Sequence, residues 1–180
     1  MSELLIATNL TNNTQHDLWR FAVIHAFDHE MGSMGFIMNQ PVANLDHKRI
    51  SELYSVGSLP RTRIFCGGPI LTDRCTIVHT PEYRTADTRV LTDQLAITFS
   101  KKIVQDINQG KGPKRYKIML GFCKWEQGQL TAEITRRQWQ TTDYSELIWS
   151  SYKNKDKMWR RIIERDSRSA SDNFLQSLEH

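Results

Sequence analysis

The sequence predicts a single α+β domain built on a mixed or mainly antiparallel sheet. Its 180 residues suffice for one apolar core, and its 39% hydrophobic and 24% charged content is that of an ordinary globular protein. Strand-like stretches dominate the first part of the chain and helix-like stretches the last part. Because the two kinds do not alternate regularly, a parallel sheet with crossover helices is not expected.

Six stretches have the composition of β-strands. The first, residues 18–27 (LWRFAVIHAF), carries β-branched and aromatic residues on both alternating sides, so both of its faces are expected to be buried. Clusters of Gly, Pro, Asn or Asp separate the stretches from one another. The other five are residues 35–40, 63–66, 75–80, 94–99 and 115–122.

The helix expected after residue 99 has signals at both ends. Ser100 is placed to cap its N-terminus, and Ile103 and Ile107 lie four residues apart on one face. Gly110 can adopt the left-handed conformation that ends a helix. These signals predict a helix that packs one apolar face on the sheet.

Apolar residues spaced four apart predict two more helices in the last part of the chain. The pairs are Leu130 with Ile134, Met158 with Ile162, and Trp159 with Ile163. A shorter helix is expected from Asp143, because Glu146 three residues later resembles a capping box. Residues 50–55 (ISELYS) form a weaker helical stretch.

The domain is predicted to span residues 1–166. Residues 167–180 have few apolar side chains and no periodicity, so burial does not offset the entropy of ordering them, and a mobile tail is expected. The last three residues, 178–180, resemble the start of an affinity tag and are excluded from the reasoning.

Apolar runs and cysteines indicate the compartment. No apolar run approaches the roughly 18–20 residues of a membrane-spanning helix, and no secretion signal is recognisable at the N-terminus. Three widely spaced cysteines, Cys66, Cys75 and Cys123, fit free thiols in a reducing compartment better than a disulfide framework. A cytoplasmic protein without membrane contact is therefore expected.

The net charge of +4 is concentrated near the C-terminus. Residues 151–168 contain seven Lys or Arg and three acidic residues, which gives 7 − 3 = +4 in that segment. Such a segment can attract nucleic acid or another anionic partner, but a solvated helix face has the same composition. No helix-turn-helix or zinc-finger pattern accompanies it.

A glycine turn, CGGPILTDRC, is the first candidate site. Gly67 and Gly68 permit unusual backbone conformations, Pro69 fixes the exit, and the N–H groups of such a turn can form an anion-binding nest beside Arg74. The alternative is a compact connection between two strands. The phosphate-loop and dinucleotide-binding spacings are both missing.

Two other arrangements were weighed as chemical sites. In HAFDH, His25, Asp28 and His29 are metal-capable, but on an extended strand they do not converge. Cys66 with His79 could form a nucleophile and base only if the fold brings them together. Since the hydrolase motifs G-x-S-x-G and H-E-x-x-H are absent, no catalytic residue and no metal ligand is assigned.

Three motifs in order closely resemble the AlgH/YqgE-type family of bacterial proteins. They are GSMGFIMNQP, CGGPILTDRCTIVH and KIMLGFCKWEQGQLTAEITRRQW, followed by MWRRII in a helix. The resemblance runs from about Leu4 to Ile163. It implies a bifurcated, partly barrel-like sheet surrounded by helices. The family is largely uncharacterised and is most often labelled a transcriptional regulator, with no established enzyme activity or cofactor.

The resemblance also supplies candidate ligand-binding residues. Gln40, Cys75 and Lys124 depart from the family pattern; Gln40 stands where a basic residue is usual, and Lys124 could restore that charge from another loop. The candidate ligand-binding residues are Met34, Gly35, Asn39, Pro41, Gly67, Gly68, Pro69, Arg74, His79 and Trp125.

Two functions follow as hypotheses. The first is a non-enzymatic regulatory or interaction protein without a cofactor, acting through a protein partner or DNA. The second is binding or transformation of a small anionic ligand at the glycine-rich loops. Asn39 lies at the centre of the second hypothesis, although an asparagine at a turn also commonly bonds neighbouring backbone groups.

Overall fold

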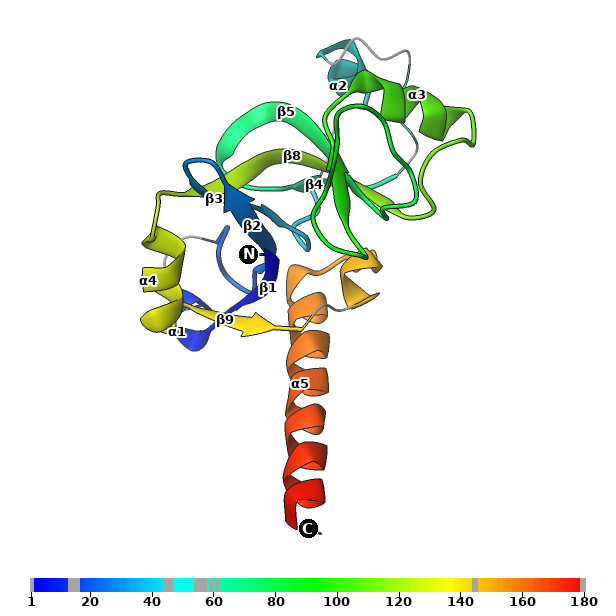
Figure 1. Ribbon diagram of the computed structural model, residues 1–180. Helices are drawn as coiled ribbons and strands as arrows, with labels where there is room; N and C mark the ends of the chain where they lie inside the picture. Colours follow the sequence, from blue (N-terminus) through cyan, green and yellow to red (C-terminus); the bar gives the residue numbers. More distant parts are fainter. Residues whose placement is uncertain are drawn as a thin grey trace.

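A curled sheet of nine strands, mainly antiparallel, forms the body of the protein, with helices around it (Figure 1). The computed structural model describes residues 2–12, 17–43, 47–53, 58, 60, 62–143 and 146–178. The strand order is β6-β7-β5-β8-β3-β2-β1-β9, and β4 pairs with β8 outside this path. The α+β class predicted from the sequence is confirmed.

The elements follow one another along the chain in this order. The strands are β1 (Ser2–Ala7), β2 (Val23–His29), β3 (Gly32–Ile37), β4 (Ile64–Cys66), β5 (Ile70–His79), β6 (Thr88–Val90), β7 (Ala96–Thr98), β8 (Tyr116–Trp125) and β9 (Trp139–Thr142). The helices are α1 (Asn9–Asn12), α2 (His47–Leu53), α3 (Lys101–Asn108), α4 (Gln129–Thr135), the 3₁₀ helix η1 (Glu146–Trp149) and α5 (Lys155–Leu178).

The sheet divides at β8, as the resemblance implied. One edge of β8 pairs with β5; the other edge pairs with β4 through residues 118–120 and with β3 through residues 123–125. The pairing of β4 with β8 is parallel, and every other strand pair is antiparallel. The chain after Cys66 enters the fork, because the N–H of Gly67 donates to the carbonyl of Leu120 at 2.7 Å and its carbonyl accepts from Ile37 at 2.9 Å.

Two glycines make the division of the sheet sterically feasible. A Cβ on Gly68 would lie 2.2 Å from the carbonyl carbon of Phe122, and one on Gly121, where φ is +70°, would lie 2.5 Å from the carbonyl oxygen of Gly68. No side chain fits at such distances. The backbones of β8 and of the turn after β4 therefore touch directly.

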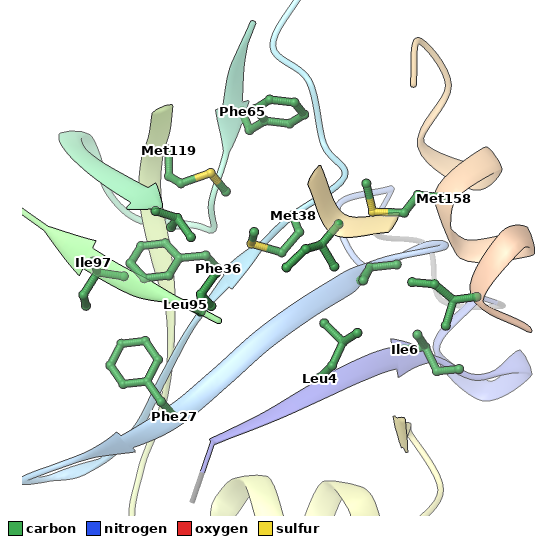
Figure 2. Close-up of a cluster of buried hydrophobic side chains, with 14 residues drawn as sticks. Leu4, Ile6, Phe27, Phe36, Met38, Phe65, Leu95, Ile97, Met119 and Met158 are labelled. Carbon is green, nitrogen blue, oxygen red and sulfur yellow. The ribbon is translucent and has the colours of Figure 1, made fainter. Parts of the chain in front are cut away.

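The side chains of successive strand residues pack into two hydrophobic cores, one on each face of the sheet. In β1, Leu4 and Ile6 pack in one cluster, whereas Leu5 packs in another on the far face. This two-sided burial was predicted for the β2 region, where residues 23–27 are all buried. Figure 2 shows the first cluster, in which strands from both branches of the sheet meet Met158 of α5.

The strand predicted at 18–27 begins later than expected. Phe21 has a left-handed φ of +55°, and residues 18–21 form a turn, so β2 starts at Val23. The sequence also gave no signal for β1, β6 or β9. Strand β1 reads SELLIA, an apolar run too short to be distinguished from a helix by periodicity.

Helix α3 begins and ends where the sequence predicts. Ser100 occupies the N-cap position in extended conformation, although its hydroxyl makes no capping hydrogen bond, and Gly110 has a φ of +72°. The helix expected from Asp143 is a single 3₁₀ turn, η1. The carboxylate of Glu146 pairs with Arg115 there, and residues 144 and 145 lie outside the described part.

Helix α5 is longer than predicted. Met158 and Ile162 are buried against the body, as their spacing indicated, and the helix then continues to Leu178 and projects away from the sheet (Figure 1). Residues 167–178, for which the sequence predicted a mobile tail, are helical. No Gly or Pro interrupts the segment, and the Ser171 hydroxyl donates to the carbonyl of Ser167 at 3.0 Å. No described helix is both long and apolar enough to cross a membrane.

Candidate functional site

Asn39, at the centre of the ligand-binding hypothesis, is a structural clamp. Its side chain is buried, and its carboxamide oxygen accepts the main-chain N–H of Val23 at 2.9 Å. The carboxamide nitrogen donates to the carbonyls of Phe21 and Lys155, each at 2.8 Å. Asn39 therefore fastens the end of β3 to the turn before β2 and to the start of α5. It shapes the neighbouring surface and does not face it.

The glycines of separate motifs meet in space, but they meet backbone to backbone. Gly35 is aligned with Cys123 of β8, and a Cβ on Gly35 would lie 2.9 Å from the carbonyl oxygen of His25. A Cβ on Gly67 would lie 2.4 Å from the carbonyl oxygen of Gly121. Backbone therefore fills the space at the glycines themselves, which supports the reading of the glycine turn as a connection between strands.

The remaining candidate residues lie in different surroundings. His79 is fully buried, and its ring nitrogens bond the carbonyl of Thr80 at 2.8 Å and the hydroxyl of Thr98 at 2.9 Å. Burial lowers the pKa of His79. Arg74 is exposed on the outer half of β5, and Met34 is half-buried in β3.

The last three candidates line cavities. Pro69 and Trp125 line a cavity beside α4, whereas Pro41 lines a separate cavity at the start of α5. The second and third motifs thus share the cavity beside α4, whereas the first motif contributes to the separate cavity at the start of α5.

The cavity at Pro41, which we call the basic pocket, has a volume of about 360 Å³. It is formed by the chain after β3, the residue before β4 and the residues at the start of α5. Its lining residues are Gln40, Pro41, Val42, Ala43, Arg63, Lys153 and Lys155. Three of the seven side chains are cationic, and none is acidic.

Two of the three cations of the basic pocket, Lys155 and Arg63, are held by main-chain carbonyls. The Lys155 ammonium donates to the carbonyls of Asp17, at 2.9 Å, and Leu18. Arg63 donates through Nη1 to the carbonyl of Ser151 at 2.8 Å. Within the described residues, none of the three cations forms an ion pair with a carboxylate. The positive charges are therefore positioned without being neutralised.

A fourth cation, Lys117, lies in the core close to Arg63. Its side chain is only 3% exposed, and its ammonium donates to the carbonyl of Met38 at 2.7 Å and lies 4.2 Å from the ring centroid of Phe65. Burial is the main cause that lowers the pKa of Lys117 to about 7, and the positive charge of Arg63 adds to it. Burial likewise lowers the pKa of Lys155 to about 8. Part of the positive charge at this place is therefore released just above neutral pH.

The described residues do not assemble the chemical sites weighed from the sequence. Both ring nitrogens of His79 bond threonine atoms, so His79 does not serve Cys66 as a base. Burial raises the pKa of the Cys75 thiol to about 12 and also raises that of Cys123. No group of three His, Cys, Asp or Glu side chains suited to a metal ion occurs in this part of the chain.

The sequence reasoning missed the three cations of the basic pocket. Lys153 and Lys155 belong to the basic segment 151–168, which was interpreted as one surface. In the structure Lys153 and Lys155 of that segment line the basic pocket, whereas three arginines farther along α5 pair with acids. Asn39 could have indicated these cations, because its hydrogen bond to Lys155 brings the start of α5 close to Pro41. The sequence alone, however, does not show which carbonyl an amide side chain will bind.

Comparison with known proteins identifies relatives whose similarity extends over most of the chain. A family model described as AlgH-like matches residues 4–169. A UPF0301 protein of Jannaschia sp. is 35% identical over 135 residues, covering 71% of this chain and 70% of its own. UPF0301 protein YqgE of Escherichia fergusonii is 33% identical over 135 residues, covering 71% and 72%.

Two solved structures share the fold. The solution structure of the AlgH protein from Pseudomonas aeruginosa has a TM-score of 0.70 and 27% identity, covering 94% of this chain and 86% of that one. A crystal structure of a Corynebacterium diphtheriae protein has a TM-score of 0.68 at 14% identity, covering 90% and 84%. The second likeness concerns the fold alone. None of these names states a ligand or an activity.

Proposed function

Because this chain belongs to the AlgH-like family, whose function is not established, we propose a role for it from its own geometry: a non-enzymatic protein that binds a small anionic ligand in the basic pocket. One observation carries the proposal. Arg63, Lys153 and Lys155 converge on one cavity with no ion-pairing carboxylate among the described residues. Unneutralised cations in a concave site attract anions strongly.

The chemistry of the lining favours a phosphate-like group. Arginine offers planar, forked donors and lysine a compact positive charge, and both are common ligands of phosphate oxygens. A cavity of about 360 Å³ is near the lower end of the range for small-molecule sites, which suits a phosphorylated or similarly charged small metabolite. The apolar edges of Pro41 and Val42 can contact the body of such a ligand.

Several features support a binding role over a catalytic one. The described residues that line the basic pocket include no acid, histidine, serine or cysteine, so none of these common bases or nucleophiles faces the proposed ligand. We further place the protein in the cytoplasm, to which its free thiols are suited. A regulatory role, as the resemblance implies, would then depend on ligand occupancy.

Thermal unfolding in the presence of inorganic pyrophosphate or sulfate tests the proposal. Ligand at about 100 times its dissociation constant adds roughly 2.7 kcal/mol of stability, which corresponds to about 5–10 °C in melting temperature for a chain of this size. Lys153→Ala should weaken pyrophosphate binding about tenfold, because one charge-assisted contact is lost. Lys153 is exposed and holds no structural contact among the described residues, so the fold should be unaffected.

Lys101→Ala provides the matched control. Lys101 is an exposed lysine at the start of α3, away from the basic pocket, and its removal changes the net charge equally. If both variants weakened pyrophosphate binding equally, the loss would be due to the lower net charge of the chain and not to a contact in the basic pocket. No stabilisation of the native chain by either anion would refute the proposed site.

A further inference from the structure

A second cavity, which we call the tryptophan pocket, lies between α4, β8 and β9. Its volume is about 430 Å³, within the range of sites that hold small organic molecules. Three of the five tryptophans of the chain line it: Trp19, Trp125 and Trp139. The other lining residues are Thr11, Pro69, Ile70, Cys123, Lys124, Gln129, Glu133, Arg136 and Gln138.

One carboxylate fixes two of the indoles. Glu133, on α4, accepts the Nε1–H of Trp125 at 2.9 Å and that of Trp139 at 2.8 Å, both on the same oxygen. Its other oxygen accepts the amide of Gln129 at 2.9 Å. Strands β8 and β9, which carry the two indoles, are thereby tied to α4.

The third indole completes an aromatic wall. Trp19 meets Trp139 edge to face, with ring centroids 6.0 Å apart and an interplanar angle of 79°. Trp125 and Trp139 are 4% and 6% exposed, so their positions are set by packing as well as by Glu133. Rigid indoles lose little conformational entropy when they receive a flat ring, and stacking on an aromatic face is favourable.

The charges around the opening favour an anionic group on the ligand. Lys124 is paired with Glu126 at 3.3 Å, and the three hydrogen bonds to Glu133 already occupy both of its oxygens. Arg136 is exposed at the end of α4 and has no ion-pair partner among the described residues. Its guanidinium is therefore free to bind a carboxylate in bidentate fashion.

We propose that the tryptophan pocket binds a small planar aromatic acid, with its ring against the indoles and its carboxylate on Arg136. This site is separate from the basic pocket, since the two cavities share no lining residue. An organic cation is the competing ligand class, because indole faces and Glu133 would attract one. The positive charges of Arg136 and Lys124 oppose it.

Three probes of equal ring size separate these ligand classes: 2-naphthoate, neutral 2-naphthylmethanol and cationic 2-naphthylmethylammonium. In a ¹H–¹⁵N spectrum of the native chain, 2-naphthoate should shift the indole N–H signals of Trp19, Trp125 and Trp139. The signals of Trp149 and Trp159, which do not line the pocket, should stay in place. Binding should be tightest for the anion and weakest for the cation.

Arg136→Ala tests the proposed carboxylate contact. It should weaken 2-naphthoate about tenfold while leaving the neutral alcohol unchanged. Arg168→Ala, at an exposed arginine on the projecting part of α5, is the control and should change neither. Tighter binding of the cation, equal effects of the two variants, or no shift of the three indole signals would overturn the proposal. Pyrophosphate should not shift these signals, so failure here is distinguishable from failure at the basic pocket.

Discussion

The basic pocket and the tryptophan pocket are organised in opposite ways. In the basic pocket Arg63 and Lys155 are held by main-chain carbonyls, and no described carboxylate pairs with the three cations. In the tryptophan pocket the central charge, Glu133, is saturated by neutral donors, and aromatic faces supply the binding surface. The first arrangement favours a charged group, and the second favours a flat apolar body. The two cavities therefore differ in expected ligand mainly because the cations lack acidic partners in one pocket and Glu133 is hydrogen-bonded in the other, and less because of their volumes.

The two pockets also depend on different clamps. Asn39 fixes the basic pocket by binding three main-chain groups from distant segments, whereas Glu133 fixes the tryptophan pocket by binding three side chains. Each of the two residues lies within one of the sequence motifs that resemble the family, Asn39 in the first and Glu133 in the third. Substituting one clamp at a time should therefore damage one pocket and leave the other intact.

The largest effect is expected for Asn39→Ala. It leaves the buried N–H of Val23 and two carbonyls without their partner, which should lower the free energy of unfolding by about 3 kcal/mol. Pyrophosphate binding should be lost, because the start of α5 is no longer held at Pro41, while 2-naphthoate should still bind. Chemical denaturation and titration of the folded variant measure both.

Gln40→Ala is the matched control for Asn39. Gln40 is the next residue and lines the basic pocket, but its fold contact is made by its carbonyl, which accepts from the N–H of Cys66. Its stability should change by less than about 0.5 kcal/mol. A drop as large as that of Asn39→Ala would contradict the clamp.

A smaller loss, about 2 kcal/mol, is expected for Glu133→Ala. Two indole N–H groups, of Trp125 and Trp139, lose their acceptor in a largely buried place. 2-Naphthoate should bind more weakly, because the indoles are no longer fixed, while pyrophosphate binding stays unchanged. Unchanged 2-naphthoate affinity together with unchanged stability would show that the carboxylate does not organise the pocket. Asp172→Ala, at an exposed acid on the projecting part of α5 that lines neither pocket, is the control.

Sequence reasoning predicted the fold better than it predicted the pockets. The glycine and proline boundaries, the helix at 101–108 and the apolar stripe of Met158 and Ile162 were read from local spacing, because turns and helix faces are local properties. The fork at β8 followed only from the family resemblance, since strand pairing joins residues far apart in the chain. The helix after residue 166 was not predicted, because lack of apolar periodicity indicates exposure rather than absence of helix.

The pockets depend on contacts that no local pattern reveals. Of the residues predicted to bind a ligand, Pro41, Pro69 and Trp125 line a cavity, but the three cations of the basic pocket and Glu133 were not among those predicted. A carboxylate four residues from Gln129 looks like an ordinary exposed helix residue until two tryptophans from other strands reach it. The residues missed are those whose role requires three segments to meet.

The two pockets should also differ in their response to pH. Burial lowers the pKa of Lys155 to about 8 and that of Lys117 to about 7, so both lysines lose positive charge as pH rises from 7 to 9. Sulfate, whose own charge is constant over this range, should bind the basic pocket about tenfold more weakly at pH 9. Binding of 2-naphthoate should stay constant, because neither of these two lysines lines the tryptophan pocket. Calorimetric titrations at pH 7, 8 and 9 provide the comparison, and equal weakening at both pockets would contradict it.

The smallest effect is expected where the sequence suggested the most charge, on α5. Unlike the cations of the basic pocket, Arg160, Arg161 and Arg165 each have an acidic partner, at 3.1, 3.8 and 2.6 Å. Replacing all three by alanine should change the affinity for duplex DNA by no more than about twofold at physiological salt, since a partly neutralised arginine releases few counterions. The measurement is DNA affinity across a series of salt concentrations for the native and triple-variant chains. A steep fall of log affinity with log salt that the substitutions flatten would instead make α5 a DNA-binding helix, and would favour direct action on transcription over ligand binding alone.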